Sequence, residues 1–217
     1  MKSTGDYDKL MEYRRSVAEL YASARSSELD PAARWERFRT ERDQLVGEHP
    51  QSPLQEEEKN KFTGLTYYDY DPALRYESLI EYDVDPDCIE IELQDDGLLR
   101  LQRFGRVRLP LEGEERSLSL FWVQGYGGGI FLPFKDATSG SETYGGGRYL
   151  LDTIKHADLG SYDGHLILDF NFAYNPSCAY NPRWHCPLSP PENNLAVAIR
   201  AGEKTYVDSD IGEAEPF

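Results

Sequence analysis

From about residue 62 onward, apolar and polar residues alternate at every second position, and this pattern constrains the fold more than any other feature. Ile89, Ile91 and Leu93, for example, alternate with Glu90 and Glu92, which is typical of a β-strand with one buried face. Similar short runs follow Gly- and Asp-rich turns with no helical pattern between them, at residues 76–83, 98–109, 118–124, 129–134, 148–151, 165–172 and 195–200. We therefore predict a mainly β domain, an antiparallel barrel or sandwich.

The first 48 residues have a different period. Val17, Leu20 and Ala24 recur at steps of three and four, which places them on one face of a helix. Asp30 and Pro31 indicate the start of a second helix, because an Asp side chain can cap free amides and Pro suits the first helical position. We expect both helices to pack on the β domain rather than to form a dimerisation hairpin. The predicted organisation is a helical segment (1–50), a β domain (62–204) and an acidic tail (205–217).

The charge of the chain restricts its partners. Acidic residues outnumber basic ones by 39 to 23, which gives a net charge of −16, and the acidic residues are spread along the whole chain. Such a surface indicates adaptation to concentrated salt, because screening there weakens the repulsion between like charges. The alternative explanation of the charge is an ordinary acidic protein. The same charge disfavours binding to nucleic acids and to anionic membranes. No run approaches 18 apolar residues and no signal peptide is recognisable, so we expect a cytoplasmic protein.

Polar side chains are densest between residues 135 and 148. Lys135, Glu142, Tyr144 and Arg148 lie there beside three consecutive glycines, 145–147. Glycine lets the backbone approach a ligand closely, and the Arg148 guanidinium suits a carboxylate or a phosphate. The alternative is structural: Arg148 would form an ion pair with Asp136 or Glu142 and hold the glycine-rich turn in place.

A second polar group follows at the end of a predicted strand. Asp169 and Asn171 are two residues apart and therefore project from the same face of that strand. With Asn175 they could orient a polar ligand, and Asp169 is the candidate general base of a hydrolase if burial raises its pKa. The alternative, which we favour for Asn175, is that the side-chain amide bonds to the local backbone of an Asn-Pro turn.

Three nearby residues raise the question of a metal. Cys178, His185 and Cys186 supply two thiols and an imidazole within nine residues, but without a paired Cys-x-x-Cys motif. We expect no metal and favour a buried thiol pair or a disulfide. Zinc completed by Asp169 is the enzymatic alternative.

Several longer motifs carry a resemblance to a known family. These are the run of residues 131–150 with its Tyr-Gly-Gly-Gly-Arg, the run 169–176 that begins Asp-Phe-Asn-Phe, and the run 186–193 that begins Cys-Pro-Leu-Ser. The chain resembles, from about Phe62 to Lys204, a family of uncharacterised proteins known as domain-of-unknown-function family 1684. The resemblance supplies no catalytic residue, and this chain lacks the β-rich module that longer members insert before the Phe62 region.

The leading functional expectation is a small polar or anionic ligand bound at one end of the β domain, where the 135–148 loop meets the 169–186 loop. Arg148 would anchor the ligand, with Asp169 and Asn171 orienting it. A hydrolase that uses Asp169 or a metal-bound water is one alternative, and a structural or interaction protein without a ligand is another. No cofactor is indicated.

Overall fold

The computed structural model describes residues 4–26, 28–94 and 97–206. Three α-helices come first: α1 (Thr4–Arg25), α2 (Pro31–Glu48) and the short α3 (Glu56–Lys59). The strands that follow are β1 (Arg75–Leu79), β2 (Cys88–Glu92), β3 (Leu98–Leu111), β4 (Glu114–Val123), β5 (Gly129–Phe134), β6 (Arg148–Asp152), β7 (Ser161–Tyr162) and β8 (His165–Asp169). Short 3-10 turns follow the later strands: Thr153–Lys155 comes after β6, and Phe170–Phe172 and Ser177–Ala179 come after β8.

The strands form two antiparallel sheets. One has five strands in the order β2-β3-β4-β5-β6, and the other has three in the order β1-β8-β7. The prediction of a mainly antiparallel β fold with N-terminal helices is therefore confirmed. In the part of the chain that the structure describes, neither sheet closes on itself, so the finer prediction of a barrel or sandwich is not confirmed.

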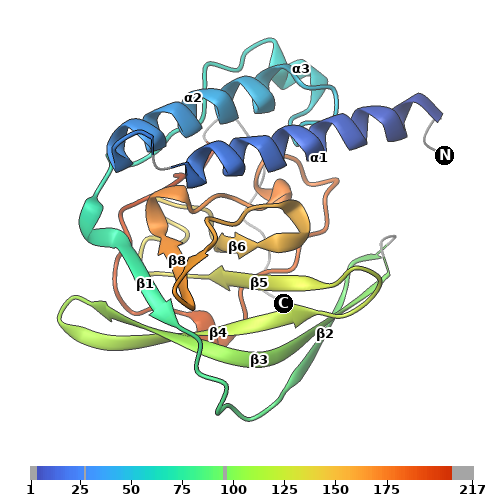
Figure 1. Ribbon diagram of the computed structural model, residues 1–217. Coiled ribbons are helices and arrows are strands. Elements are labelled where there is room, and N and C mark those ends of the chain that lie inside the picture. The colour runs from blue at the N-terminus through green and yellow to red at the C-terminus, as the bar shows by residue number, and fades with distance from the viewer. Residues whose placement is uncertain (1–3, 27, 95–96, 207–217) are drawn as a thin grey trace.

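Helices α1 and α2 lie beside one another across one side of the molecule, and β3 and β4 cross the other side (Figure 1). The buried faces of the helices include Val17, Leu20, Trp35 and Phe38. They meet apolar residues of the sheets and of the later turns, as where the Phe38 ring packs edge-on against Phe172 with centroids 4.7 Å apart. No helix among the described residues is both long and apolar enough to span a membrane.

The start of α2 follows directly from local chemistry. The Asp30 carboxylate accepts hydrogen bonds from the backbone N–H groups of Ala32 and Ala33, both at 3.1 Å, and Pro31 takes the first helical position. These contacts satisfy two amides that have no partner inside the helix.

We expect Asp30→Ala to lower the free energy of unfolding by about 1 kcal/mol, because the two amides lose their acceptor. Asp30→Asn retains an acceptor oxygen at the same place and should cost much less. Urea denaturation of both variants measures the difference. Equal losses would show that the cap contributes nothing specific.

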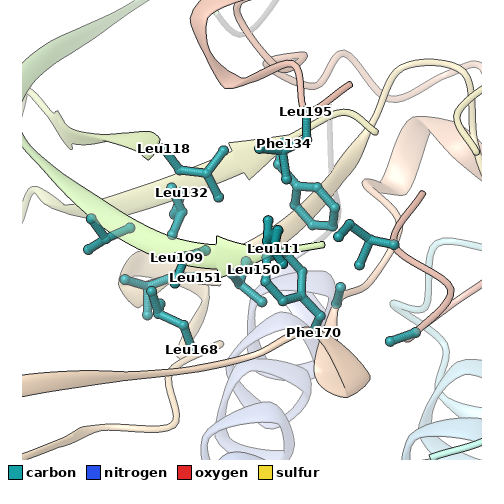
Figure 2. Close-up of a cluster of buried hydrophobic side chains, with 14 of the residues drawn as sticks. Leu109, Leu111, Leu118, Leu132, Phe134, Leu150, Leu151, Leu168, Phe170 and Leu195 are labelled. Carbon is teal, nitrogen blue, oxygen red and sulfur yellow. The ribbon is translucent and has the colours of Figure 1, made fainter. Parts of the chain in front are cut away.

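Alternate residues of the five-stranded sheet face two different cores. Leu132 and Phe134 of β5 join a cluster with Leu109, Leu118 and other residues that face β8 and the turn after it (Figure 2). Phe131, the residue before Leu132, joins the cluster under α1 and α2. The sheet is therefore buried on both faces at β5, which fixes its register, since a slip of one residue would exchange the two sets of side chains.

One predicted strand is wrong. The run 195–200 alternates buried and exposed residues, but it pairs with no strand. Its backbone instead bonds to a loop and to a side chain: Leu195 N–H donates to the Lys135 carbonyl at 2.8 Å, and Ile199 N–H donates to Asp136 Oδ2 at 2.9 Å. The division into three segments stays a prediction, and residues 207–217 of the predicted acidic tail lie outside the described residues.

Candidate functional site

The glycine-rich turn before β6 packs against its own chain. Gly147 has a φ of +91°, and a Cβ at this position would lie 2.6 Å from the Phe134 carbonyl oxygen. Both the backbone conformation and the close approach therefore require glycine. Arg148, the first residue of β6, follows it with its side chain pointing into the protein, where it is 1% exposed.

Arg148 forms a dense set of internal contacts. Its Nη2 atom donates to Asp136 Oδ2 at 3.0 Å and to the Ile199 carbonyl at 2.9 Å. Its Nη1 atom donates to the carbonyls of Ala201 and Glu203. Burial lowers the pKa of Arg148, and the neighbouring Asp136 carboxylate opposes that shift. These contacts favour the structural alternative, an Arg148–Asp136 ion pair, while the ligand-anchoring role of Arg148 stays a prediction without a supporting contact.

The other predicted residues of this turn are separated. The Glu142 carboxylate faces outward and forms a two-pronged ion pair with Arg200, with the shortest distance at 2.7 Å, and it also accepts from the Tyr68 hydroxyl at 3.0 Å. Lys135 is half-buried, and its backbone bonds to residues 193 and 195. The Tyr144 hydroxyl donates to Cys178 Sγ at 3.6 Å. Lys135, Glu142 and Tyr144 therefore do not converge with Arg148 on one cavity.

Asp169 and Asn171 do meet, but inside the fold. Asp169 is 3% exposed, and its Oδ1 accepts from the Asn171 backbone N–H at 3.0 Å and from Asn171 Nδ2 at 2.7 Å. The Asn171 side chain also exchanges two hydrogen bonds with the backbone of Asp71, at 2.8 and 2.9 Å. Burial raises the pKa of Asp169, and the bonds from Asn171 oppose the rise. The pair thus fastens β8 to the segment before β1, and the general-base role of Asp169 stays a prediction.

A buried acid lies beneath the loop that follows. The Glu203 carboxylate is 1% exposed and accepts hydrogen bonds from Arg42 Nε, from the Tyr180 hydroxyl and from the Asn175 backbone N–H, the last at 2.9 Å. Asn175 Nδ2 donates to the Lys204 carbonyl at 2.8 Å, which is 29 positions away, so this amide bonds to a distant segment and not to the local backbone of its Asn-Pro turn. This network joins α2 to the two turns around residues 175 and 180.

Next to this network a pocket of about 350 Å³ opens between α1 and the 174–186 loop. Its walls are largely aromatic and apolar, formed by Tyr13, Val17, Tyr21, Tyr174 and Trp184. Its size falls within the usual range for small-molecule sites. Two buried polar atoms of lining residues, the Tyr174 hydroxyl and Asn175 Oδ1, have no hydrogen-bond partner among the described residues. Such atoms cost about 1–3 kcal/mol each and often mark places that water or a ligand approaches.

The charged side chains that line the pocket, among the described residues, are basic. Arg14, Arg42 and Lys155 line it, and no carboxylate is among the lining residues in the described part of the chain. Arg42 is paired with Glu203 behind the wall and lies over the Tyr174 ring, 5.1 Å from its centroid. Arg14 and Lys155 are exposed at the rim. A basic pocket in a chain of net charge −16 is a local reversal of the overall field.

The two thiols meet at one edge of this pocket. Cys186 lines the pocket, and Cys178 does not. The Cys178 thiol donates a hydrogen bond to the Cys186 sulfur, which also accepts the backbone N–H of Cys178 at 3.3 Å and that of Ser177. These bonds lower the pKa of Cys186, and Lys155 contributes to the lowering. The same pairing raises the pKa of Cys178, with burial adding to the rise.

The structure therefore brings together the thiol pair that the sequence favoured. His185 also lines the pocket. Among the described residues, however, no three His, Cys, Asp or Glu side chains gather as they would around a metal ion. Asp169, the proposed fourth ligand, lies elsewhere, beside Arg34 and Arg75 in a small pocket of about 40 Å³.

Most residues of the pocket could not be predicted from the sequence. Asn175, His185 and Cys186 were singled out from sequence, but Tyr13, Arg14, Arg42 and Lys155 were not. The three from α1 and α2 are separated from the loop by more than 130 residues, and nothing in their local pattern indicates a site. Only the packing of the helices on the loop creates it.

A larger groove of about 640 Å³ runs along the outer side of α1 and α2. Acidic and basic side chains both line this groove, with Glu12, Glu41 and Glu48 among the acidic ones. Two of the basic side chains are already paired, since Lys9 pairs with Glu12 and Arg37 pairs with Glu41. Exposed ion pairs of this kind cover ordinary helix surfaces. We therefore take the smaller, mainly apolar pocket as the candidate site.

A family model described as "protein of unknown function (DUF1684)" matches residues 60–204. The chain belongs to this family. An uncharacterised protein of Haloarcula marismortui, with a structure solved by solution NMR, is 36% identical. The match covers 82% of this chain and 95% of that one, with a TM-score of 0.59. Among curated proteins, none matches this chain. The family is described as being of unknown function and the similar structure as uncharacterised. Neither tests the adaptation to salt expected from the charge of this DUF1684 chain, which stays a prediction.

Proposed function

We propose that this protein binds a small anionic ligand with a flat apolar body in the pocket between α1 and the 174–186 loop. The observation that carries the proposal is the combination of aromatic walls with basic residues and no lining carboxylate among the described residues. An acidic protein repels anions over most of its surface, so a basic pocket provides a selective place for them.

The lining divides into two parts with different roles. Tyr13, Tyr174 and Trp184 present ring surfaces that favour an aromatic or otherwise flat apolar body. Arg14 and Lys155 at the rim would hold the carboxylate or phosphate of the ligand. Arg42 contributes less free charge, because Glu203 already pairs with it.

The proposal predicts that the pocket binds a negatively charged ligand in preference to an uncharged ligand of the same shape. Aromatic carboxylates should raise the melting temperature, whereas the matching carboxamides should not. At a concentration ten times the dissociation constant, the stabilisation is about 1.4 kcal/mol, or roughly 3–5 °C for a chain of this size. Differential scanning fluorimetry at low ionic strength, followed by calorimetric titration of the best carboxylate, makes the measurement.

Two neighbouring arginines provide a matched control. Arg14 lines the pocket and Arg15, the next residue of α1, does not, although both are exposed. Arg14→Ala combined with Lys155→Ala should weaken binding of the carboxylate by at least tenfold, and Arg15→Ala should leave it unchanged. Binding that is equal in all variants, or equal for carboxylates and carboxamides, would contradict the proposal.

There are two alternative functions. One is a hydrolase that uses Asp169, and the other is a purely structural role. The buried hydrogen bonds of Asp169 to Asn171 support a structural part for that side chain, and no observation favours turnover. We therefore put ligand binding first.

A further inference from the structure

Cys178 and Cys186 are two free thiols at the pocket, and neither is among the residues that would hold the anion. They lie eight positions apart, on the 3-10 turn Ser177–Ala179 and on the loop that follows it. The two sulfurs share a hydrogen bond, and no disulfide joins them. Both sulfurs are thus placed for thiol–disulfide exchange, in which a second thiol must lie within reach of the first.

The environment distinguishes the two thiols. The Cys186 sulfur accepts three hydrogen bonds, from the Cys178 thiol and from the backbone N–H groups of Ser177 and Cys178, and it lies near the Lys155 cation. Donors and positive charge stabilise a thiolate, and together they lower the pKa of Cys186 to about 6. Cys178 is a donor in this pair, and the Tyr144 hydroxyl donates to its sulfur at 3.6 Å.

Both cysteines are half-buried, but only one of them lines the pocket. Cys186 lines the pocket, beside Lys155 and His185, whereas Cys178 is not part of its wall. A molecule that enters the pocket therefore meets Cys186 first. One sulfur in the pocket wall with a second sulfur hydrogen-bonded to it is an arrangement that permits thiol–disulfide exchange.

We propose that Cys178 and Cys186 form a redox-active dithiol that reduces small disulfides entering the pocket, with Cys186 as the attacking sulfur and Cys178 as the resolving one. The proposal goes beyond anion binding and does not depend on it.

The reaction balances in two steps. The Cys186 thiolate attacks one sulfur of RS–SR, an S–S bond forms between them, the original S–S bond breaks, and RS⁻ leaves and takes a proton from solvent. Cys178 then loses its proton and attacks Cys186 Sγ, so that the mixed disulfide breaks and the second RS⁻ leaves with that proton. One disulfide is reduced by two electrons to two thiols, and the dithiol is oxidised to a Cys178–Cys186 disulfide.

Glutathione disulfide is the probe, and mass mapping of the full chain after acid quenching is the readout. The wild-type protein should end with a Cys178–Cys186 disulfide and release two glutathione molecules per chain. Cys178→Ser should retain one glutathione on Cys186. Cys186→Ser should form an adduct at Cys178 at least tenfold more slowly, and Cys88→Ser, which removes the exposed third cysteine, should behave as wild type.

Alkylation by iodoacetamide gives a second measurement that does not need the disulfide. The pH profile for Cys186 in the wild-type protein should have its midpoint near pH 6, compared with about 8.5 for the unperturbed cysteine thiol of a model peptide. At pH 5.5 Cys186 should then react roughly ten- to twentyfold faster than such a free thiol, because its larger thiolate fraction outweighs the lower nucleophilicity of a weaker base.

Several outcomes would overturn the dithiol. The first is a Cys186 adduct that forms no faster than the Cys88 adduct. The second is a wild-type reaction that stops at the mixed disulfide. The third is an alkylation midpoint for Cys186 equal to that of a free thiol, in protein whose near-ultraviolet circular dichroism is native. The neutral 2-hydroxyethyl disulfide separates this inference from the proposed function. If it oxidises the pair while no carboxylate binds, the dithiol stands and the anion site falls.

Discussion

Replacing Arg148 with methionine is expected to lower the free energy of unfolding by about 5 kcal/mol. Methionine preserves much of the volume, but it leaves the Asp136 carboxylate buried without its cation. It also removes the donors of three backbone carbonyls, those of Ile199, Ala201 and Glu203. An unpaired buried charge and several unsatisfied carbonyls are among the few causes of such large losses.

Chemical denaturation of Arg148→Met, with Arg108→Met as the control, measures this effect. Arg108 also forms two ion pairs, with Glu81 and Glu115, but its side chain is 42% exposed. The control should therefore lose about 1 kcal/mol or less. Adding Asp136→Asn to Arg148→Met should recover part of the loss, because it removes the stranded charge. Comparable stabilities of the two methionine variants would show that the buried contacts of Arg148 contribute little.

The second large effect is expected at Glu203. Glu203→Ala should lower the free energy of unfolding by about 4 kcal/mol. It leaves the buried Arg42 cation without its counter-charge, and it leaves the Asn175 backbone N–H and the Tyr180 hydroxyl without an acceptor. Glu203→Gln keeps the shape and an acceptor oxygen, so it should cost less than the alanine variant.

An exposed acid provides the comparison for Glu203. Glu90 pairs with Arg100 at 2.7 Å, and both side chains are about half exposed, at 53% and 52%. Glu90→Ala should change the free energy of unfolding by about 0.5 kcal/mol or less. Urea midpoints for the three variants test the ranking. A loss at Glu203 no larger than the loss at Glu90 would refute the argument from burial.

Features of the fold that depend on neighbouring residues could be predicted from the sequence. The Asp30-Pro31 start of α2 needs only the local chain, and so does the alternation that predicts β2 and the first part of β3. The Arg148–Asp136 pair was recognised among the alternatives because both residues lie at the ends of one turn.

Features that depend on the meeting of distant segments could not be predicted. The run 195–200 alternates because one of its faces is buried, and the sequence does not reveal that its backbone bonds go to Lys135 and Asp136 instead of a strand. The pocket combines Arg14 of α1 with a loop near residue 180, and no local pattern links them. The position of β6 between two cores also turned Arg148 inward, away from the predicted ligand.

The dependence of both buried cations on the segment 199–203 has a consequence for the timing of folding. Arg42 finds its carboxylate, and Arg148 finds three backbone carbonyls, only when that segment is in place, and the Arg42–Glu203 contact spans 161 positions. A chain emerging from the ribosome therefore carries α1, α2 and all eight described strands before the carboxylate that neutralises Arg42 has been synthesised. Long-range contacts of this kind slow folding, so the native state should be reached only after synthesis has passed Glu203, with the incomplete chain exposed to aggregation or to chaperones until then.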